Sequence, residues 1–375
     1  NEILSYSSVN IINASVPFLL LPILTSYLTP EDYGVLSMVQ LLMTLSLPFV
    51  IMNSQRLLTM EYSNISLEEY KSLVSSAIII PFFGFLFLEL IYLLIKEPII
   101  KYFQIPEYLV YLIPVFLLFQ IIPIFIPIIF QAKKEPLNFG KFKITLTIIN
   151  VLLSLLFIVY FGFGWEGRIF GIVSAFLLST VLGVFILFKI KIINFNINKT
   201  DIKRILRFGI PLLPHAIAGI VLASSSKFFL SSIINNEALG IYSVAFQIAG
   251  GVLLLMTSIN QAWAPNLYEI LNSNPSKEIK KRLVFKTYKT MLLMTFITIL
   301  FIIVVPYIYY LFIDERFHSG IFVSRIIAIG FLMNGLYYLV TNYIVYTKRT
   351  EILSYITTIV SIVGAFINYY LIVKF

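Results

Sequence analysis

The sequence predicts an all-α, polytopic membrane protein. Its 375 residues are 59% hydrophobic and only 12% charged, whereas about a quarter of the residues in a soluble protein carry a charge. The apolar residues come in blocks of about 20, the length of a helix that crosses the hydrocarbon core. The blocks do not alternate as barrel strands do. Backbone groups in lipid must bond within their own segment, which favours helices.

Eleven apolar blocks are expected to span the membrane. Their approximate limits are 3–28, 34–58, 72–95, 108–131, 144–163, 169–188, 208–233, 238–262, 287–312, 321–346 and 352–373. The linkers between them are short, which leaves no room for a soluble domain. The chain contains no cysteine, which excludes disulfides and cysteine metal sites. No signal peptide is recognised, and both ends are expected to be incomplete.

The positions of Lys and Arg predict the orientation. With the N-terminus in the cytoplasm, 20 of the 27 Lys and Arg side chains fall on the cytoplasmic side, as the positive-inside rule requires. The outer side then carries Lys96, Lys101, Arg168, Arg316 and Lys374. This distribution accounts for the net charge of +9, so no nucleic acid partner is expected. The predicted location is the cytoplasmic (inner) membrane of a bacterium.

Two basic linkers, 196–208 and 276–289, have the pattern of amphipathic helices on the cytoplasmic surface. In the first linker, the side chains expected to face lipid are Ile202, Ile205, Leu206 and Phe208, and those expected to face lipid phosphates are Lys203, Arg204 and Arg207. The alternative is that both linkers are loops whose only role is to set the topology.

Two short motifs indicate an internal repeat. Residues 31–37 (EDYGVLS) align with residues 237–243 (EALGIYS) at an offset of 206. Lys133-Lys134 align with Lys348-Arg349 at an offset of 215, so the second half needs a small insertion. Two similar halves of six helices are typical of transporters.

The repeat predicts the domain organisation. We expect an N-terminal six-helix lobe over residues 1–190 and an amphipathic cytoplasmic linker over residues 191–207. A C-terminal lobe then covers residues 208–375 and contains five helices. The twelfth helix is expected to lie beyond Phe375.

Several stretches, taken in order, resemble the O-antigen and capsule repeat-unit flippases of the multidrug, oligosaccharidyl-lipid and polysaccharide exporter superfamily. They are residues 22–34 (PILTSYLTPEDYG), 211–215 (PLLPH), 239–245 (LGIYSVA), 260–265 (NQAWAP) and 347–350 (TKRT). The resemblance implies twelve helices in two lobes around a central cavity. It also implies that polyprenyl-diphosphate-linked oligosaccharides pass from the inner to the outer leaflet, as in lipopolysaccharide or capsule synthesis. Such proteins often carry an acidic residue in the seventh helix, where residues 223–227 read ASSSK.

Three cations in or near the spans are candidates for substrate binding, because charges at membrane depth are costly and usually face a cavity. They are Lys227 in span seven, Arg56 near the inner end of span two and Arg325 near the outer end of span ten. A cation there can hold a diphosphate or an acidic sugar. Alternatively, Lys227 extends to the outer surface, and Arg56 and Arg325 are interfacial anchors.

Two titratable residues are candidates for ion coupling. Glu89 is the only carboxylate well inside a span, and His215 follows a proline in span seven. Glu89 can equally be interfacial, and His215 can equally form a hydrogen bond between helices. The amides expected to bind sugar hydroxyls, or alternatively to link helices, are Gln40, Asn53, Gln247 and Asn260.

The chain is not expected to be an enzyme or to need a cofactor. Two separated histidines without cysteine cannot form a conventional zinc site, and there is no phosphate-binding loop. A glycan polymerase would need a sizeable outer loop, whereas the longest outer linker is 96–107. The nearer alternative is an ion-coupled multidrug or metabolite antiporter of the same superfamily. The expected partners are the lipid-linked oligosaccharide, membrane lipid, H+ or Na+, and the glycan polymerase machinery.

Overall fold

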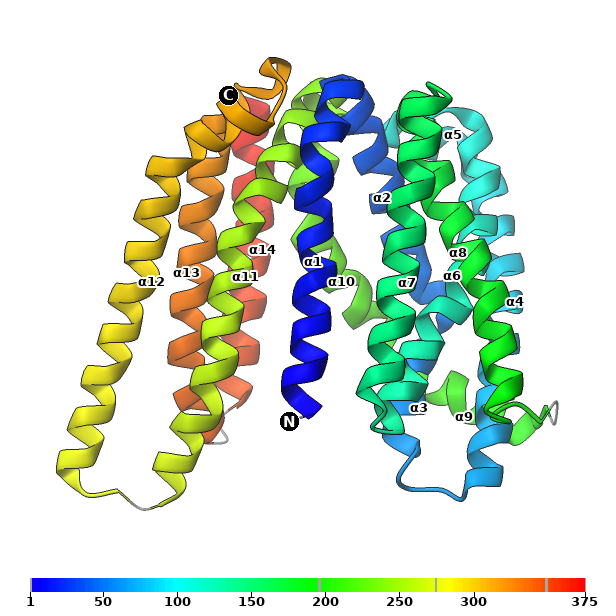
Figure 1. The fold of residues 1–375 in the computed structure, drawn as a ribbon, viewed down its shortest axis with the longest axis horizontal. Coiled ribbons are helices and arrows are strands. Elements are labelled where there is room, and N and C mark those ends of the chain that lie inside the picture. Colours follow the sequence, from blue (N-terminus) through cyan, green and yellow to red (C-terminus); the bar gives the residue numbers. More distant parts are fainter. Residues whose placement is uncertain (1, 195–196, 274, 348–349, 375) are drawn as a thin grey trace. The chain divides into compact units, whose positions relative to one another are not determined.

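The computed structural model describes residues 2–194, 197–273, 275–347 and 350–374, and its regular elements over these residues are all helices (Figure 1). Nine of the described helices are long and apolar enough to cross a membrane. The prediction of an all-α, polytopic membrane protein is therefore confirmed. The side chains of residues 2–8 and of parts of the last helix lie outside the described set.

The long helices follow the predicted apolar blocks. They are α1 (Glu2–Tyr27), α2 (Pro30–Ile51), α4 (Leu67–Leu94), α6 (Glu107–Ala132), α7 (Pro136–Leu155), α8 (Gly164–Lys189), α10 (Leu213–Phe229), α11 (Asn236–Asn272), α12 (Lys277–Phe312), α13 (Gly320–Tyr346) and α14 (Thr350–Lys374). The shorter helices are α3 (Ser54–Glu61), α5 (Lys96–Phe103) and α9 (Lys199–Gly209). The π-helical turns η1 (Leu156–Tyr160) and η3 (Leu230–Ile234) extend α7 and α10.

The second predicted span, 34–58, is not continuous. Helix α2 ends at Ile51, and Met52 and Asn53 have φ angles of 49° and 50°, in the left-handed region that ends an α-helix. Helix α3 then begins at Ser54. The backbone of α9 fits closely against this break, because a Cβ on Gly209 would lie 1.9 Å from the carbonyl oxygen of Met52. The break therefore depends on a neighbouring helix.

The two basic linkers differ from their predicted form. The second linker, 276–289, does not form a separate helix, because its residues from Lys277 onward are the first turns of the long helix α12. The first linker does form a helix, α9, but Ile205 is fully buried in protein. Arg204 forms an ion pair of 2.7 Å with Glu61. The prediction that Ile205 faces lipid and Arg204 faces phosphates is therefore wrong, because α9 packs on α3 and α4.

The chain divides into two compact units. The first contains Asn1–Leu20 and Glu31–Glu237, and the second contains Leu21–Pro30 and Ala238–Phe375. Helices α9 and α10 thus pack with the first unit, whereas the sequence placed residues from 208 onward in the second lobe. The predicted division at 190 and 208 stays a prediction.

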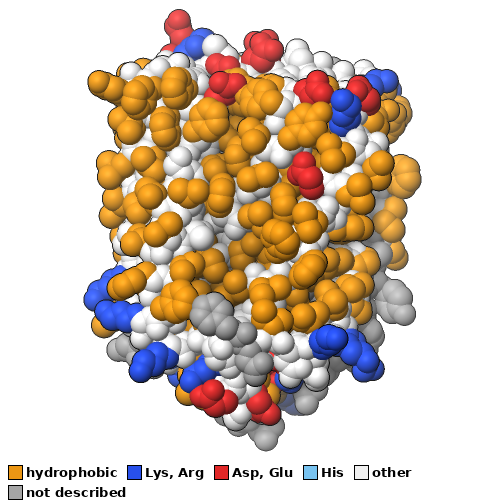
Figure 2. Space-filling model, turned by 90° about the vertical axis from the view of Figure 1, so that its right-hand side faces the viewer, with side chains coloured by type: hydrophobic (Ala, Val, Ile, Leu, Met, Phe, Trp, Pro, Cys, Tyr) orange, Lys and Arg blue, Asp and Glu red, His pale blue; other side chains and the backbone are white. Residues whose placement is uncertain are grey.

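In the first unit, α8 packs against both α6 and α7, and α4 packs against α6 (Figure 1). Small residues bring these helices close together, as is usual where packing rather than the hydrophobic effect holds membrane helices together. A Cβ on Gly171 of α8 would lie 2.6 Å from the Cα of Ser154 on α7. Figure 2 shows an apolar belt on one face of this unit, with basic side chains gathered at its lower end.

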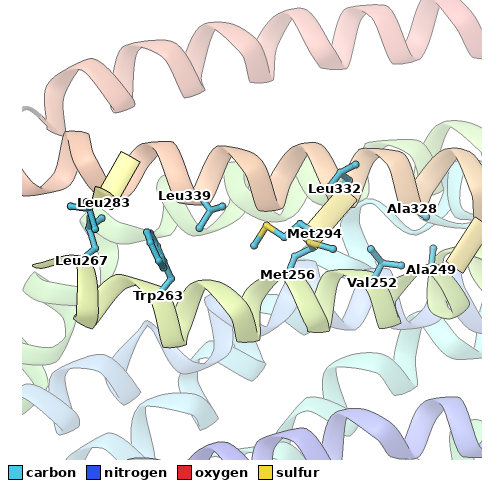
Figure 3. Close-up of a cluster of buried hydrophobic side chains, with 10 residues drawn as sticks. All are labelled: Ala249, Val252, Met256, Trp263, Leu267, Leu283, Met294, Ala328, Leu332 and Leu339. Atoms are coloured by element: carbon cyan, nitrogen blue, oxygen red, sulfur yellow. The ribbon is translucent and has the colours of Figure 1, made fainter. Parts of the chain in front are cut away.

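In the second unit, α11, α12 and α13 enclose a buried apolar cluster (Figure 3). Its members are Ala249, Val252, Met256, Trp263, Leu267, Leu283, Met294, Ala328, Leu332 and Leu339. Polar pairs cross the same helices. The Nδ2 atom of Asn342 donates to Oδ1 of Asn260 over 2.8 Å, and the hydroxyls of Thr287 and Tyr343 lie 2.6 Å apart.

The C-terminal end of α1 belongs to the second unit, and Arg316 holds it there. The NH2 group of Arg316 donates to the carbonyl oxygens of Thr25 at 3.0 Å and Ser26 at 3.3 Å. These carbonyls lie in the last turn of α1, where a cation also complements the helix dipole. Asp314 accepts from Nε of Arg316 over 2.7 Å, and this hydrogen bond lowers the pKa of the Asp314 carboxyl.

The Gly34→Ala substitution should destabilise the first unit. A Cβ on Gly34 would lie 1.9 Å from the carbonyl oxygen of Asn236, and a backbone atom has little room to move. We expect a loss of about 1–3 kcal/mol in the free energy of unfolding, measured by denaturation in detergent micelles. The matched control is Gly330→Ala, where nothing lies within 4 Å of the new Cβ. Equal stability of the two variants would contradict this packing.

Asn260 and Asn342 should stabilise the second unit as a pair. A double-mutant cycle with Asn260→Leu and Asn342→Leu should give a coupling free energy of about 0.6 kcal/mol, with an upper limit of about 1.7 kcal/mol. The control cycle replaces Asn260→Leu with Asn266→Leu, because the hydrogen bond that Asn266 forms among the described residues is to Ala262 of its own helix. Additive effects in the Asn260 cycle would show that this hydrogen bond is not the contact that matters.

Candidate functional site

The first unit contains a polar cavity of 230 Å³ within its helices. Three helices line it, and the lining residues are Asn13, Val16, Pro17 and Leu20 from α1, Leu146, Thr147 and Asn150 from α7, and Arg168 and Phe176 from α8. Five of these residues are apolar, and the other four present two amides, a hydroxyl and a guanidinium. Such a mixture of apolar walls and a few convergent polar groups is typical of ligand sites.

Arg168 is the only charged residue among the described residues that line this cavity. Its NH1 group donates to Oδ1 of Asn150 over 2.6 Å and also to the hydroxyl of Ser154. No carboxylate of the described residues forms an ion pair with Arg168. The sequence placed Arg168 among the outer-surface cations, whereas in the structure it turns inward. Among the described residues, its hydrogen-bond acceptors are therefore neutral.

The packing of α8 explains why Arg168 turns inward. Gly167 and Gly171 lie one turn apart, and both approach the preceding helical segment closely. A Cβ on Gly167 would lie 3.0 Å from the backbone of Phe157, and one on Gly171 would lie 2.5 Å from the hydroxyl of Ser154. Arg168 lies between the two glycines in sequence, so the close approach brings its guanidinium within reach of acceptors on α7.

Polar contacts continue from this cavity along α1 and α7. The hydroxyl of Thr147 donates to Oδ1 of Asn13, whose Nδ2 donates to the Val9 carbonyl over 2.8 Å. One turn closer to the N-terminus of α7, Nζ of Lys143 donates to Oδ1 of Asn10 over 3.0 Å. The two helices therefore meet along polar side chains, which can offer both donors and acceptors to hydroxylated or anionic groups.

Sequence analysis missed this group of residues. Asn13 and Asn150 lie singly within apolar blocks, and Arg168 lies near a predicted span end, where a cation is ordinary. One signal was present, because Gly167 and Gly171 form the small-xxx-small pattern of close helix contacts. An arginine next to such a pattern is drawn toward a neighbouring helix.

The structure places the predicted site residues of the first unit in different settings. Lys227 is partly buried near the C-terminal end of α10, and His215 is exposed in the first turn of that helix. Gln40 is exposed on α2, and Arg56 is exposed on α3 rather than on a spanning helix. Asn53 is buried at the break after α2, where its Nδ2 lies 3.5 Å from the Gly209 carbonyl oxygen.

Glu89 lies on α4, on the same helix as many exposed apolar side chains. Glu89 as a whole is partly exposed, but its Oε2 atom is buried and has no hydrogen-bond partner among the described residues. An unsatisfied carboxylate oxygen in an apolar segment is costly. Uptake of a proton or a cation would reduce that cost.

Two predicted residues of the second unit have partners on neighbouring helices. Asn260 accepts from Asn342, as described above. Nε of Arg325 donates to the Ile302 carbonyl of α12 over 3.3 Å. Gln247 is partly buried on α11. For Asn260 and Arg325, helix–helix bonding thus uses part of the hydrogen-bonding capacity that the substrate hypothesis requires.

The described residues include no group of three or more His, Cys, Asp or Glu side chains that could hold a metal ion. The described residues that line the polar cavity around Arg168 are one cation and eight neutral residues. Its chemistry suits an anionic or hydroxylated ligand rather than a metal.

Comparisons with known structures give the fold. The chain is similar to the inward-facing conformation of a multidrug resistance MATE family transporter of the MOP superfamily. The similarity covers 96% of this chain and 93% of that transporter, with 13% sequence identity and a TM-score of 0.63. A MATE protein in complex with MaL6 is also similar, over 92% of this chain and 85% of that protein, with 14% sequence identity and a TM-score of 0.55. These similarities show a shared fold.

Comparisons of sequence give the family. No curated protein sequence matches the chain. The family described as polysaccharide biosynthesis protein matches residues 1–271, which is most of the chain, and confirms the resemblance that the sequence motifs indicated. The chain belongs to the polysaccharide biosynthesis protein family and has the fold of MOP-superfamily transporters.

Proposed function

We propose that this protein transfers polyprenyl-diphosphate-linked oligosaccharide repeat units, such as those of lipopolysaccharide or capsule, from the inner to the outer leaflet of the cytoplasmic membrane. The family and the transporter fold support a transport role. The observation that carries the proposal further is Arg168, which lines a polar cavity inside a membrane unit and has no carboxylate partner among the described residues.

The cavity has the chemistry that a charged glycan head needs. A guanidinium offers donors to a phosphate or to an acidic sugar, and the amides of Asn13 and Asn150 and the hydroxyl of Thr147 suit sugar hydroxyls. The cavity is small for a whole repeat unit, so in this proposal it holds one charged group while the polyprenyl tail stays in lipid. Lys227 is proposed as a second cation for the head group.

Retaining an arginine here has a measurable cost. A charged side chain at the centre of a spanning helix costs roughly 2.5–3.5 kcal/mol in insertion experiments. The cost for Arg168 is smaller, because it is the fifth residue of α8 and lies near the helix end. Two neutral acceptors on α7 offset part of that cost, but a carboxylate would offset more. An anionic substrate would supply a negative charge that no described residue gives Arg168 in an ion pair, and this favours a flippase over an exporter of cationic drugs.

The alternative is an ion-coupled multidrug or metabolite antiporter of the same superfamily. The stretch of α1 that lines the cavity, from Asn13 to Leu20, contains no acidic side chain to attract a cationic drug. In either case we propose alternating access, with the N-terminus in the cytoplasm and with Glu89 or His215 binding the coupling ion. A glycan polymerase, which would consume the transferred units, is proposed as a partner.

The Arg168→Ala and Lys227→Ala variants should each lose at least about tenfold in initial rate, because loss of a charge-assisted hydrogen bond costs about 1.5–3 kcal/mol. The measurement is leaflet transfer of a polyprenyl-diphosphate oligosaccharide in proteoliposomes, read with an impermeant reagent for outer-leaflet sugar. The control Lys101→Ala removes an exposed cation of α5 and should transfer normally. No transfer by the wild type, together with efflux of cationic dyes, would favour the antiporter instead.

Proton coupling should depend on Glu89. We expect the wild-type rate to change with an imposed pH gradient and the Glu89→Gln variant to be insensitive to it, because the amide cannot take up a proton. His215→Gln serves as the comparison, since that residue is exposed. A gradient response that survives in Glu89→Gln but disappears in His215→Gln would move the coupling role to His215. A response that survives in both variants would remove both residues from the coupling mechanism.

A further inference from the structure

Helix α9 is held against the first unit by one of its faces. The hydroxyl of Ser72 on α4 donates to Oδ2 of Asp201 over 2.6 Å, and Arg204 pairs with Glu61 of α3. Ile205 is fully buried between these contacts, and Gly209 lies against Met52. Four successive attachments along one helix fix its rotation. The opposite face is therefore a defined surface and not that of a mobile loop.

That opposite face borders a hollow of 580 Å³. The lining residues are Lys199, Ile202, Lys203, Leu206, Arg207, Ile210 and Pro211. Residues four apart lie above one another on a helix, so the lining forms two adjacent rows. One row is cationic and contains Lys199, Lys203 and Arg207. The other row is aliphatic and is formed by the remaining residues.

The cationic row has no acidic counterpart in the part of the chain that the structure describes. None of its three members forms an ion pair there. Asp201, the acidic residue of α9, lies on the attached side and accepts from Ser72. All three cations are exposed, and Ile210 in the neighbouring row is 50% exposed. Three cations without an ion pair among the described residues lie beside aliphatic side chains that are half-buried (Ile202, Leu206) or exposed (Ile210). This arrangement favours a partner that is both anionic and apolar.

We propose that this face of α9, here called the α9 face, binds an anionic phospholipid of the adjacent leaflet. The phosphate would lie against Lys199, Lys203 and Arg207, and the upper part of the acyl chain would lie against Ile202, Leu206 and Ile210. A free phosphate or nucleotide would use only the first row. A polar protein surface would leave the second row exposed to water. Basic helical surfaces next to spanning segments commonly recognise acidic lipids in this way.

The α9 face is independent of the transport cycle proposed above. None of its residues lines the cavity around Arg168. Helix α9 lies in the chain between α8 and α10, so a bound lipid would anchor this connection to the membrane. The proposal can therefore be correct even if the protein carries a different substrate.

The test compares lipid binding to the full-length protein in neutral detergent micelles. Titrations with phosphatidylglycerol and with phosphatidylcholine, followed by native mass spectrometry, give the apparent affinity for each lipid. The test variant is Lys199→Gln/Lys203→Gln/Arg207→Gln. The matched control Lys277→Gln/Lys280→Gln/Lys281→Gln removes the same charge from exposed positions at the start of α12. We expect the test variant to bind phosphatidylglycerol at least about tenfold more weakly and the control to bind like the wild type.

A second variant tests the aliphatic row. Ile202→Ser/Leu206→Ser should weaken phosphatidylglycerol binding without changing the cationic row. Melting curves in micelles without added lipid show that each variant is folded. Equal binding of the two lipids by the wild type, or an equal loss in the α12 control, would overturn the proposal. Competition by millimolar inorganic phosphate would also overturn it and would identify a site for soluble anions.

Discussion

Backbone hydrogen bonding in a medium without water is the constraint on which the rest of this structure depends. Each peptide group in the hydrocarbon must bond to another peptide group, and only a continuous helix provides this within one segment. Helix ends are then the difficult places, because four carbonyls and four amides lose their partners. Arg316 solves this at the end of α1 by donating to two of its last carbonyls. Ser66 and Glu69 solve it at the start of α4 with a reciprocal capping box.

Close helix packing follows from the same constraint. Lipid chains are as apolar as leucine, so helices associate through fit and through hydrogen bonds between them. Gly171 lets α8 approach α7 closely, and that approach gives Arg168 its two acceptors. The polar character of the cavity is thus a consequence of backbone packing. A larger residue at Gly171 would separate the helices and leave the guanidinium without those partners.

Charge has two separate roles in this molecule. Many of the cations lie near helix ends, where Lys and Arg commonly set the topology of membrane proteins. A few are used inside the fold, and these have specific neighbours: Arg168 with Asn150, Arg325 with the Ile302 carbonyl, and Arg204 with Glu61. The difference is invisible in composition, because both kinds contribute equally to the net charge of +9.

The sequence alone determined the fold class, the helices with their approximate limits and the family. Spanning a hydrocarbon layer is a local property of about 20 consecutive residues, and motifs such as residues 22–34 are local too. The structural counterpart of the aligned residues 31–37 and 237–243 is visible, since they lie in the first turns of α2 and α11. In the second pair of aligned motifs, Lys133-Lys134 and Lys348-Arg349, the latter two residues lie outside the described residues.

Only the tertiary structure decided which side chains meet. The break at Met52, the inward turn of Arg168 and the attachment of α9 all depend on neighbours on other helices, such as Gly209, Asn150 and Glu61. Periodicity within one segment carries no information about those neighbours. For that reason Asn260 was recognised from the sequence as a polar residue in a span, but its partner Asn342 was not. A site built from three helices is set by their packing, whereas each helix is set by its own residues.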